Sequence, residues 1–501
     1  MELGLQYEQL KCYSCVLDTV MRREEAQEAI VSDTYPDIAS IVNASGMVMM
    51  SQCCISGDML KAEGQINATV LYEPESGTGL QALEVQIPYR CSAEAGAADE
   101  TCRLHASVQL QSVDVKVLNP RKIYVRAEVS LHVQAYQENN CQYSVALNEP
   151  DETMCVKREQ IDLGYIAQVT EKCFPFEEYI NLNPGTVPER LVGWEAVPYC
   201  TESKLVGSRV VFQGGLKTKL RFLTADGELL IEDYDLPLSQ VLEAGAAGEG
   251  ATTIVHLAVA DGEAFLDGKD AVQLHLELHA WGVLYDQQRR EVLTDAYSIQ
   301  SVSNCSVDAL PSFSLVAQDV RTLAFRQPLD ALMPSSEVVD QSVQLCELTA
   351  GDNPNEYNCR LKIRLCMKDS SGQLSQMEQT CYVPIQLPSF VCDTKWVECF
   401  LMDAVCISAA GGVEVRGSLH LDYVMLRKAS YSTLRSITLN EAADAVPTPR
   451  PSAVLRMLRS NETLWDLGKA YASTVEDIMA VNQINDEREA GNRFLLIPRK
   501  R

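Results

Sequence analysis

The stretch VRAEVSLHV, Val125–Val133, alternates apolar and polar side chains without a break. A period of two is typical of a β-strand that buries one face and exposes the other. The same alternation returns in LHLELHA at Leu274–Ala280 and in VRGSLHLDY at Val415–Tyr423. The chain therefore contains three copies of one strand, which predicts an internal repeat.

Other features recur upstream of each copy. An alternating segment runs into a Gly-containing turn and then to a Pro, an order typical of a β-hairpin whose second strand ends near the Pro. These prolines are Pro88, Pro237 and Pro384, and earlier ones precede them at Pro36, Pro188 and Pro334. We therefore predict three β-rich repeats, at residues 32–136, 177–285 and 326–430.

The pentapeptide EAGAA follows the hairpin in the first two repeats, at Glu94–Ala98 and Glu243–Ala247. A phosphate-binding loop needs Gly at set positions before a helix, usually with a following Lys. Neither copy opens an amphipathic helix, and the second continues as GEGATT. We interpret EAGAA as a repeat landmark. The predicted fold class is mainly β, with three antiparallel β-sandwich-like units followed by a small α+β (βααβ) domain.

Composition limits the possible partners. The chain has 501 residues and a formal net charge of −27, without the clustered Lys and Arg that nucleic acid or an anionic membrane requires. It shows no apolar run of about 18 residues that would insert into a bilayer. The amino end shows no export signal, and the 18 cysteines are irregularly spaced. We expect reduced thiols and a cytoplasmic protein.

The segments outside the repeats give weaker signals. LDTVMRREEAQEAIVSD predicts a helix within an amino-terminal segment at residues 1–31. Residues 137–176 and 286–325 are less periodic, and we interpret them as connections. NEAADAVPTPRPS, residues 440–452, contains three prolines and predicts an extended linker.

Residues 453–501 carry the most specific pattern. Asn461 is a candidate cap for a helix with Leu464 and Leu467 on its apolar face, and Ser473 with Glu476 forms a candidate capping box for a second helix. Short apolar segments flank the pair. The order strand, helix, helix, strand predicts a small α+β domain.

This segment resembles a LysM module in its Thr463-Leu464-Trp465 turn, its STVEDIMAVNQI helix and its closing LLIP. LysM modules bind N-acetylglucosamine glycans such as peptidoglycan in a shallow groove. The resemblance implies a groove for glycan or partner at Asn461, Glu462, Thr463, Leu464, Gln483, Ile484 and Asn485. Leu464 and Ile484 are its apolar anchors, and Trp465 is expected in the core. Asn461-Glu462 replaces the usual Gly-Asp, which predicts weak glycan binding.

Three β-rich repeats with Pro36-Asp37-Ile38 near the start, followed by a LysM module, resemble the SipL-type spore-coat morphogenetic proteins. That resemblance implies a non-catalytic scaffold on the mother-cell side of the forespore surface, in the cytosol. Its LysM module would recruit the coat's basement-layer morphogenetic ATPase. The alternative is a peptidoglycan-binding protein, although that ligand lies outside the cytosolic membrane.

One segment carries a pattern that could bind a metal. HLELH places His275, Glu277 and His279 on one face of a strand, which is one possible metal site. The same face is polar in the other two repeats, so we interpret these residues as a solvated surface. The sequence indicates no nucleophile–base set or paired carboxylates. We therefore predict no enzymatic activity, no catalytic residues, no metal and no cofactor.

Overall fold

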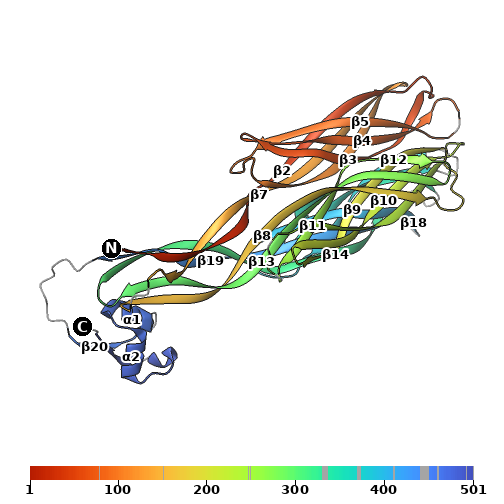
Figure 1. Cartoon of the computed structure of the whole chain (residues 1–501). Coiled ribbons are helices and arrows are strands. Elements are labelled where there is room, and N and C mark those ends of the chain that lie inside the picture. Colours follow the sequence, from red (N-terminus) through yellow and green to blue (C-terminus); the bar gives the residue numbers. More distant parts are fainter. Residues whose placement is uncertain are drawn as a thin grey trace.

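A computed structural model describes the chain apart from residues 78, 150–151, 246, 249, 330–336, 369–373, 410–411, 441–450, 460–461, 492 and 500–501. The described residues form antiparallel sheets, with two short α-helices near the carboxyl end (Figure 1). The predicted mainly β fold class is confirmed. Among the described helices, none is long and apolar enough to cross a membrane.

Three units, each of six strands, follow one another along the described chain, after a short strand β1 (Glu2–Leu3). Unit 1 contains β2 (Leu5–Ile30), β3 (Ile38–Ser56), β4 (Met59–Pro74), β5 (Gln81–Glu94), β6 (Arg103–Asn119) and β7 (Lys122–Leu147). Unit 2 contains β8 (Met154–Asn181), β9 (Arg190–Val206), β10 (Arg209–Leu223), β11 (Leu229–Glu243), β12 (Thr252–Asp267) and β13 (Ala271–Ser298). Unit 3 contains β14 (Val302–Leu329), β15 (Glu337–Ala350), β16 (Glu356–Lys368), β17 (Leu374–Gln386), β18 (Thr394–Ala409) and β19 (Gly412–Asn440).

Each unit is built from two sheets. One is a meander, with strand order β3-β4-β5, β9-β10-β11 or β15-β16-β17. In the other sheet, the last strand of the unit lies between the fifth strand and the first strand and pairs with both. The strand orders are β6-β7-β2, β12-β13-β8 and β18-β19-β14. The core of unit 1 combines side chains of both sheets. Val125, Ala127, Val129, Leu131 and Val133 are all fully buried in it. Each buried Val or Leu contributes roughly 1.5–3 kcal/mol.

The units also repeat their irregularities. A β-bulge interrupts β6 between Leu110 and Ser112, and bulges lie at matching places in β12 and β18. Further bulges recur near the ends of the long strands, on β7, β13 and β19. A bulge adds one residue to one strand and reverses which face the following side chains point to. Because bulges occur at matching positions in all three segments, the segments are three copies of one structural unit.

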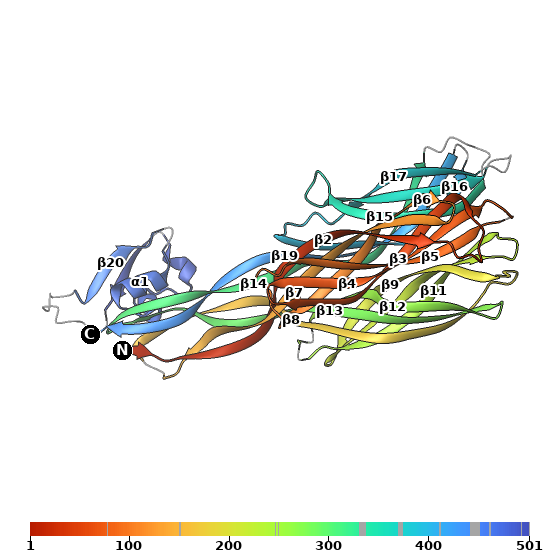
Figure 2. The same cartoon turned by 90° about the horizontal axis from the view of Figure 1, so that it is seen from above.

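The three units pack together at one end of the molecule, and their long strands all extend toward the other end (Figure 1). Their meander sheets lie together in a wide head, where β12 packs on β3 and β6 on β15 (Figures 1 and 2). The long strands β7, β8, β13, β14 and β19 run out of this head as a narrow stem that ends at the helices (Figure 1). Leu5, Leu293, Leu434 and Ile437 form part of the stem's own apolar core.

Two predictions about the segments outside the repeats are wrong. Residues 1–31 were expected to contain a helix, but Leu5–Ile30 is the strand β2, paired along its length with β7. Residues 137–176 and 286–325 were expected to be connections, but they mostly belong to the stem strands. Sheet pairing overrides the helix propensity of Glu, Ala and Arg in β2. Bulges break the alternation in the stem strands. The predicted linker, 440–452, lies mostly outside the described residues.

Glycine at one position in the stem is required by a close backbone contact. Gly164 on β8 faces β14, and its amide donates a hydrogen bond to Ser312 Oγ at 2.8 Å. A Cβ atom built on Gly164 would lie 1.9 Å from the carbonyl oxygen of Phe313. No side chain fits there, so the two strands approach as closely as their backbones allow.

We predict that Gly164→Ala destabilises the chain by about 1–3 kcal/mol, because the stem strands must separate to admit a methyl group. Chemical denaturation of the full chain measures this change. Gly250→Ala is the matched control, since a Cβ there meets no atom within 4 Å. Equal denaturation midpoints for the two variants would contradict this, because they would show that the strands separate at Gly164 without loss of stability.

Candidate functional site: the carboxyl-terminal module and its seat on the stem

The carboxyl-terminal module has the predicted order of elements. The strand β20 (Ala453–Met457) pairs with β21 (Phe494–Pro498), and between them lie α1 (Leu464–Tyr471), α2 (Val475–Asn482) and the 3-10 turn η1 (Glu487–Ala490). The module has a small core of its own, formed by Leu464, Leu467, Ile478, Ile484, Ala490, Leu495 and Ile497. The strand–helix–helix–strand arrangement is therefore a closed structural unit.

Both helices begin at threonines rather than at the predicted caps. Thr463 Oγ1 accepts a hydrogen bond from the Asp466 amide at 3.2 Å, and Asp466 Oδ2 accepts one from the Thr463 amide at 2.9 Å. Thr474 caps α2, since its Oγ1 accepts a hydrogen bond from the Asp477 amide at 3.1 Å. The predicted box at Ser473 is one residue too early, and the predicted cap Asn461 lies outside the described residues.

The predicted groove residues divide into a buried set and a surface set. Leu464 and Ile484 are 1% and 5% exposed, so their side chains belong to the module's core and offer no apolar anchor at the surface. The expectation that they form exposed anchors is wrong. Their burial in one core cluster does bring the start of α1 and the end of α2 together.

The polar members of the predicted groove lie at the surface of the same two loops. Thr463, Gln483 and Asn485 are exposed, and Gln483 ends α2 in a left-handed conformation at φ 52°. Glu462 is half-buried because its carboxylate pairs with Arg456 at 2.5 Å and accepts the Arg459 amide at 3.2 Å. These residues place hydrogen-bonding groups on a small surface beside the start of α1 and the end of α2.

Trp465 does not lie in the module's core, where the sequence placed it. Its indole Nε1 donates a hydrogen bond to Asp295 Oδ2 on β13 at 2.8 Å. The ring packs edge-on against Tyr297, with centroids 4.7 Å apart. Trp465 therefore fixes the module to the end of the stem.

Further contacts complete this seat, which we define as Asp295, Tyr297, Trp465, Lys469 and Ser473. Lys469 Nζ lies 2.7 Å from Asp295 Oδ1, and Tyr297 Oη donates to the carbonyl of Ser473 at 2.7 Å. Burial, followed by a hydrogen bond with Cys155, raises the pKa of Tyr297, so its hydroxyl keeps the proton that it donates. The seat combines an ion pair, two neutral donors and an aromatic contact.

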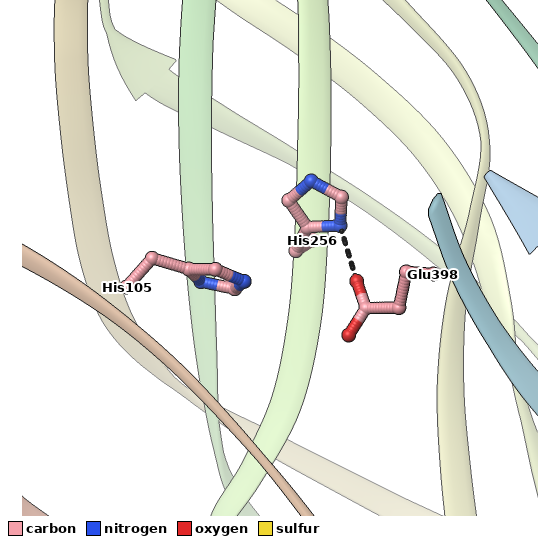
Figure 3. A group of neighbouring side chains, drawn as sticks. All are labelled: His105, His256 and Glu398. Atoms are coloured by element: carbon pink, nitrogen blue, oxygen red, sulfur yellow. Dashed lines mark ion pairs between the residues drawn. The ribbon is translucent and has the colours of Figure 1, made fainter. Parts of the chain in front are cut away.

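A second polar cluster, which sequence reasoning missed, lies in the head. A cavity of about 780 Å³ is lined by strands of all three units, including His256 on β12 and Glu398 on β18. His105 on β6 points toward these two side chains (Figure 3). The three residues come from three repeats, and no local motif marks any of them. None of the HLELH residues on β13 belongs to this group of three.

Burial and pairing set the charges in this cluster. Burial lowers the pKa of His105 to about 3. Burial opposes the charged form of His256, but its hydrogen bond and charge attraction to Glu398 outweigh this effect and raise its pKa. For Glu398 burial is likewise outweighed by His256, and its pKa falls to about 2. Burial raises the pKa of Asp422 to about 7.

Comparison with known proteins gives one match. Residues 37–118, which run from just before β3 almost to the end of β6, match the family described as SipL, SPOCS domain. No curated protein and no solved structure matches the chain. The family match supports the resemblance to SipL-type proteins in unit 1.

The structure separates residues that seat the module from residues that fold it. We predict that Trp465→Ala loosens the module from the stem by about 1–2 kcal/mol, because one hydrogen bond and one aromatic contact are lost. Ile484→Ala instead destabilises the module itself by about 2–5 kcal/mol, because it leaves a cavity. Hydrogen exchange of the β20–β21 region in the full chain, combined with small-angle scattering, distinguishes the two effects.

Val481→Ala is the matched control, because Val481 lies on α2 and is 46% exposed. It should leave both exchange and scattering unchanged. If Trp465→Ala accelerated exchange throughout the module as Ile484→Ala does, Trp465 would be a core residue and the seat would not depend on it.

Proposed function

We propose that this chain is a non-catalytic scaffold in the assembly of the bacterial endospore coat. It would act in the cytosol, on the mother-cell side of the forespore surface. The observation that carries the proposal is the match of unit 1 to the SipL SPOCS domain. The repetition of that unit's fold and the LysM-like order of the terminal module are consistent with it.

The terminal module is the proposed site of partner binding. By resemblance to SipL-type proteins, the partner is the morphogenetic ATPase of the coat's basement layer. The exposed side chains of Gln483 and Asn485 can contact a protein, on a surface that the Thr463 cap of α1 holds in place. Three β-rich units with long strands would carry this surface at the end of a stem.

Recruitment of the ATPase is tested with the purified full chain and purified ATPase by calorimetry. We expect binding that is lost when residues 451–501 are deleted. The double variant Gln483→Arg/Asn485→Arg should weaken it about tenfold or more, a loss of ~1.4 kcal/mol, because two bulky cations then cover the proposed surface. Gln52→Arg, at an exposed position of unit 1, is the control. Undiminished binding by the deleted chain would assign the interaction to the repeats.

Peptidoglycan binding is the alternative function of a LysM-like module. Glu462 is engaged by Arg456 and by the Arg459 amide, so it is not available to a sugar without breaking those contacts. We therefore predict little or no retention of the full chain on insoluble sacculi. Glu462→Gly should strengthen that retention, since it removes the long side chain and its contacts with Arg456 and the Arg459 amide from this turn. Saturable retention of the unmodified chain would favour the glycan function.

A further inference from the structure

Three side chains from three different units converge on one point in the head (Figure 3). The ligand-type atoms of His105, His256 and Glu398 all lie within 4.8 Å of one another. His256 Nδ1 is 3.0 Å from Glu398 Oε2, and it is also 3.8 Å from Asp422 Oδ2 on β19. Two imidazoles and two carboxylates thus gather where units 1, 2 and 3 meet.

This cluster is largely buried at the wall of the cavity. The side chains of His256, Glu398 and Asp422 are 9%, 16% and 4% exposed, and His105 is buried. Trp281 stacks on His105 with centroids 4.0 Å apart, and Trp396 packs edge-on against His256 at 4.4 Å. Aromatic walls of this kind strengthen any electrostatic interaction at the centre and make an unbalanced charge costly there.

An ion pair between His256 and Glu398 accounts for only part of the arrangement. It leaves Asp422 as a second buried carboxylate, and its Oδ1 atom has no hydrogen-bond partner in the part of the chain that the structure describes. It also gives the ring nitrogens of His105, which face this pair (Figure 3), no ligand. A divalent cation among neutral imidazoles would balance both carboxylates and would supply the partner that Asp422 Oδ1 lacks.

We propose that His105, His256, Glu398 and Asp422 bind a Zn²⁺ ion that joins the three units. Zn²⁺ favours four nitrogen and oxygen ligands in a tetrahedron, with ligand atoms about 3.3 Å apart. The ligand atoms of His105, His256 and Glu398 lie within 4.8 Å of one another, and Asp422 Oδ2 lies 3.8 Å from His256 Nδ1, so side-chain movements that draw these groups together would complete the site. The two imidazoles disfavour Ca²⁺ and Mg²⁺, which prefer oxygen ligands.

Four protein ligands leave no open position, so the ion is structural rather than catalytic. Each unit supplies at least one ligand, and unit 3 supplies two. The ion therefore binds tightly only when all three units are folded and packed together, and its binding free energy then adds to the stability of the whole head. Neither the terminal module nor the proposed partner contributes to this site.

The test uses the full chain, depleted of metal with a chelator and then titrated with Zn²⁺ under reducing conditions. We expect one ion per chain and a higher unfolding temperature in the loaded protein. Glu398→Gln and His105→Asn should each weaken binding by about two orders of magnitude, since even removal of an outer-shell partner costs up to about a hundredfold. The control is His275→Asn, which alters an exposed position of HLELH on β13 and should leave binding unchanged.

Thiols are the competing ligands, because Cys12 and Cys141 approach to 3.3 Å and Cys359 and Cys399 to 3.4 Å. Co²⁺ loaded in place of Zn²⁺ distinguishes them, since thiolate ligands add an intense near-ultraviolet charge-transfer band. We expect tetrahedral visible bands without that band. A thiolate band, the absence of Zn²⁺ binding, or full binding by the folded Glu398→Gln chain would overturn the site. If the variants do not fold, the Co²⁺ spectrum of the unmodified chain decides.

Discussion

The pairing of the first and last strands in each unit is the constraint on which the rest of the structure depends. β7 pairs with β2 from Lys122 to Leu147, and β13 with β8 and β19 with β14 follow the same plan. Each last strand buries every second side chain in the core of the head and then continues into the stem. Because one continuous strand serves both regions, the register set by the head core also fixes the stem.

The sequence predicted those parts of the fold where one face of a strand is buried. Val125–Val133 alternates because every second side chain enters the core, and the counterparts on β13 and β19 do the same. β2 gave no such signal, since most of its side chains are exposed and MRREEAQEAI is rich in helix-forming residues. In the stem, each bulge reverses the alternation, so a periodic pattern is not maintained long enough to recognise.

The candidate sites were harder to predict for a different reason. In the terminal module, the order of elements followed from capping residues and apolar spacing, but Trp465 was misplaced because its contacts lie on β13, far away in the chain. The head cluster had no local pattern at all. His256 and Glu398 occupy matching positions before the bulges of β12 and β18, yet the matching residue on β6 is Ser107. The three repeats have the same backbone geometry. A site built from all three, however, requires different side chains from different repeats, so the repeat pattern does not reveal it.

The stem also has a mechanical consequence. Both the amino terminus and the terminal module lie at the end of the stem remote from the head (Figure 1). A pull on the module is passed through Asp295 and Tyr297 to β13 and acts along the strand axes. The backbone hydrogen bonds of antiparallel strands run perpendicular to those axes, so such a pull loads many of them together in shear rather than one after another. A pull between the head and the module would therefore be opposed by many hydrogen bonds of the stem at once.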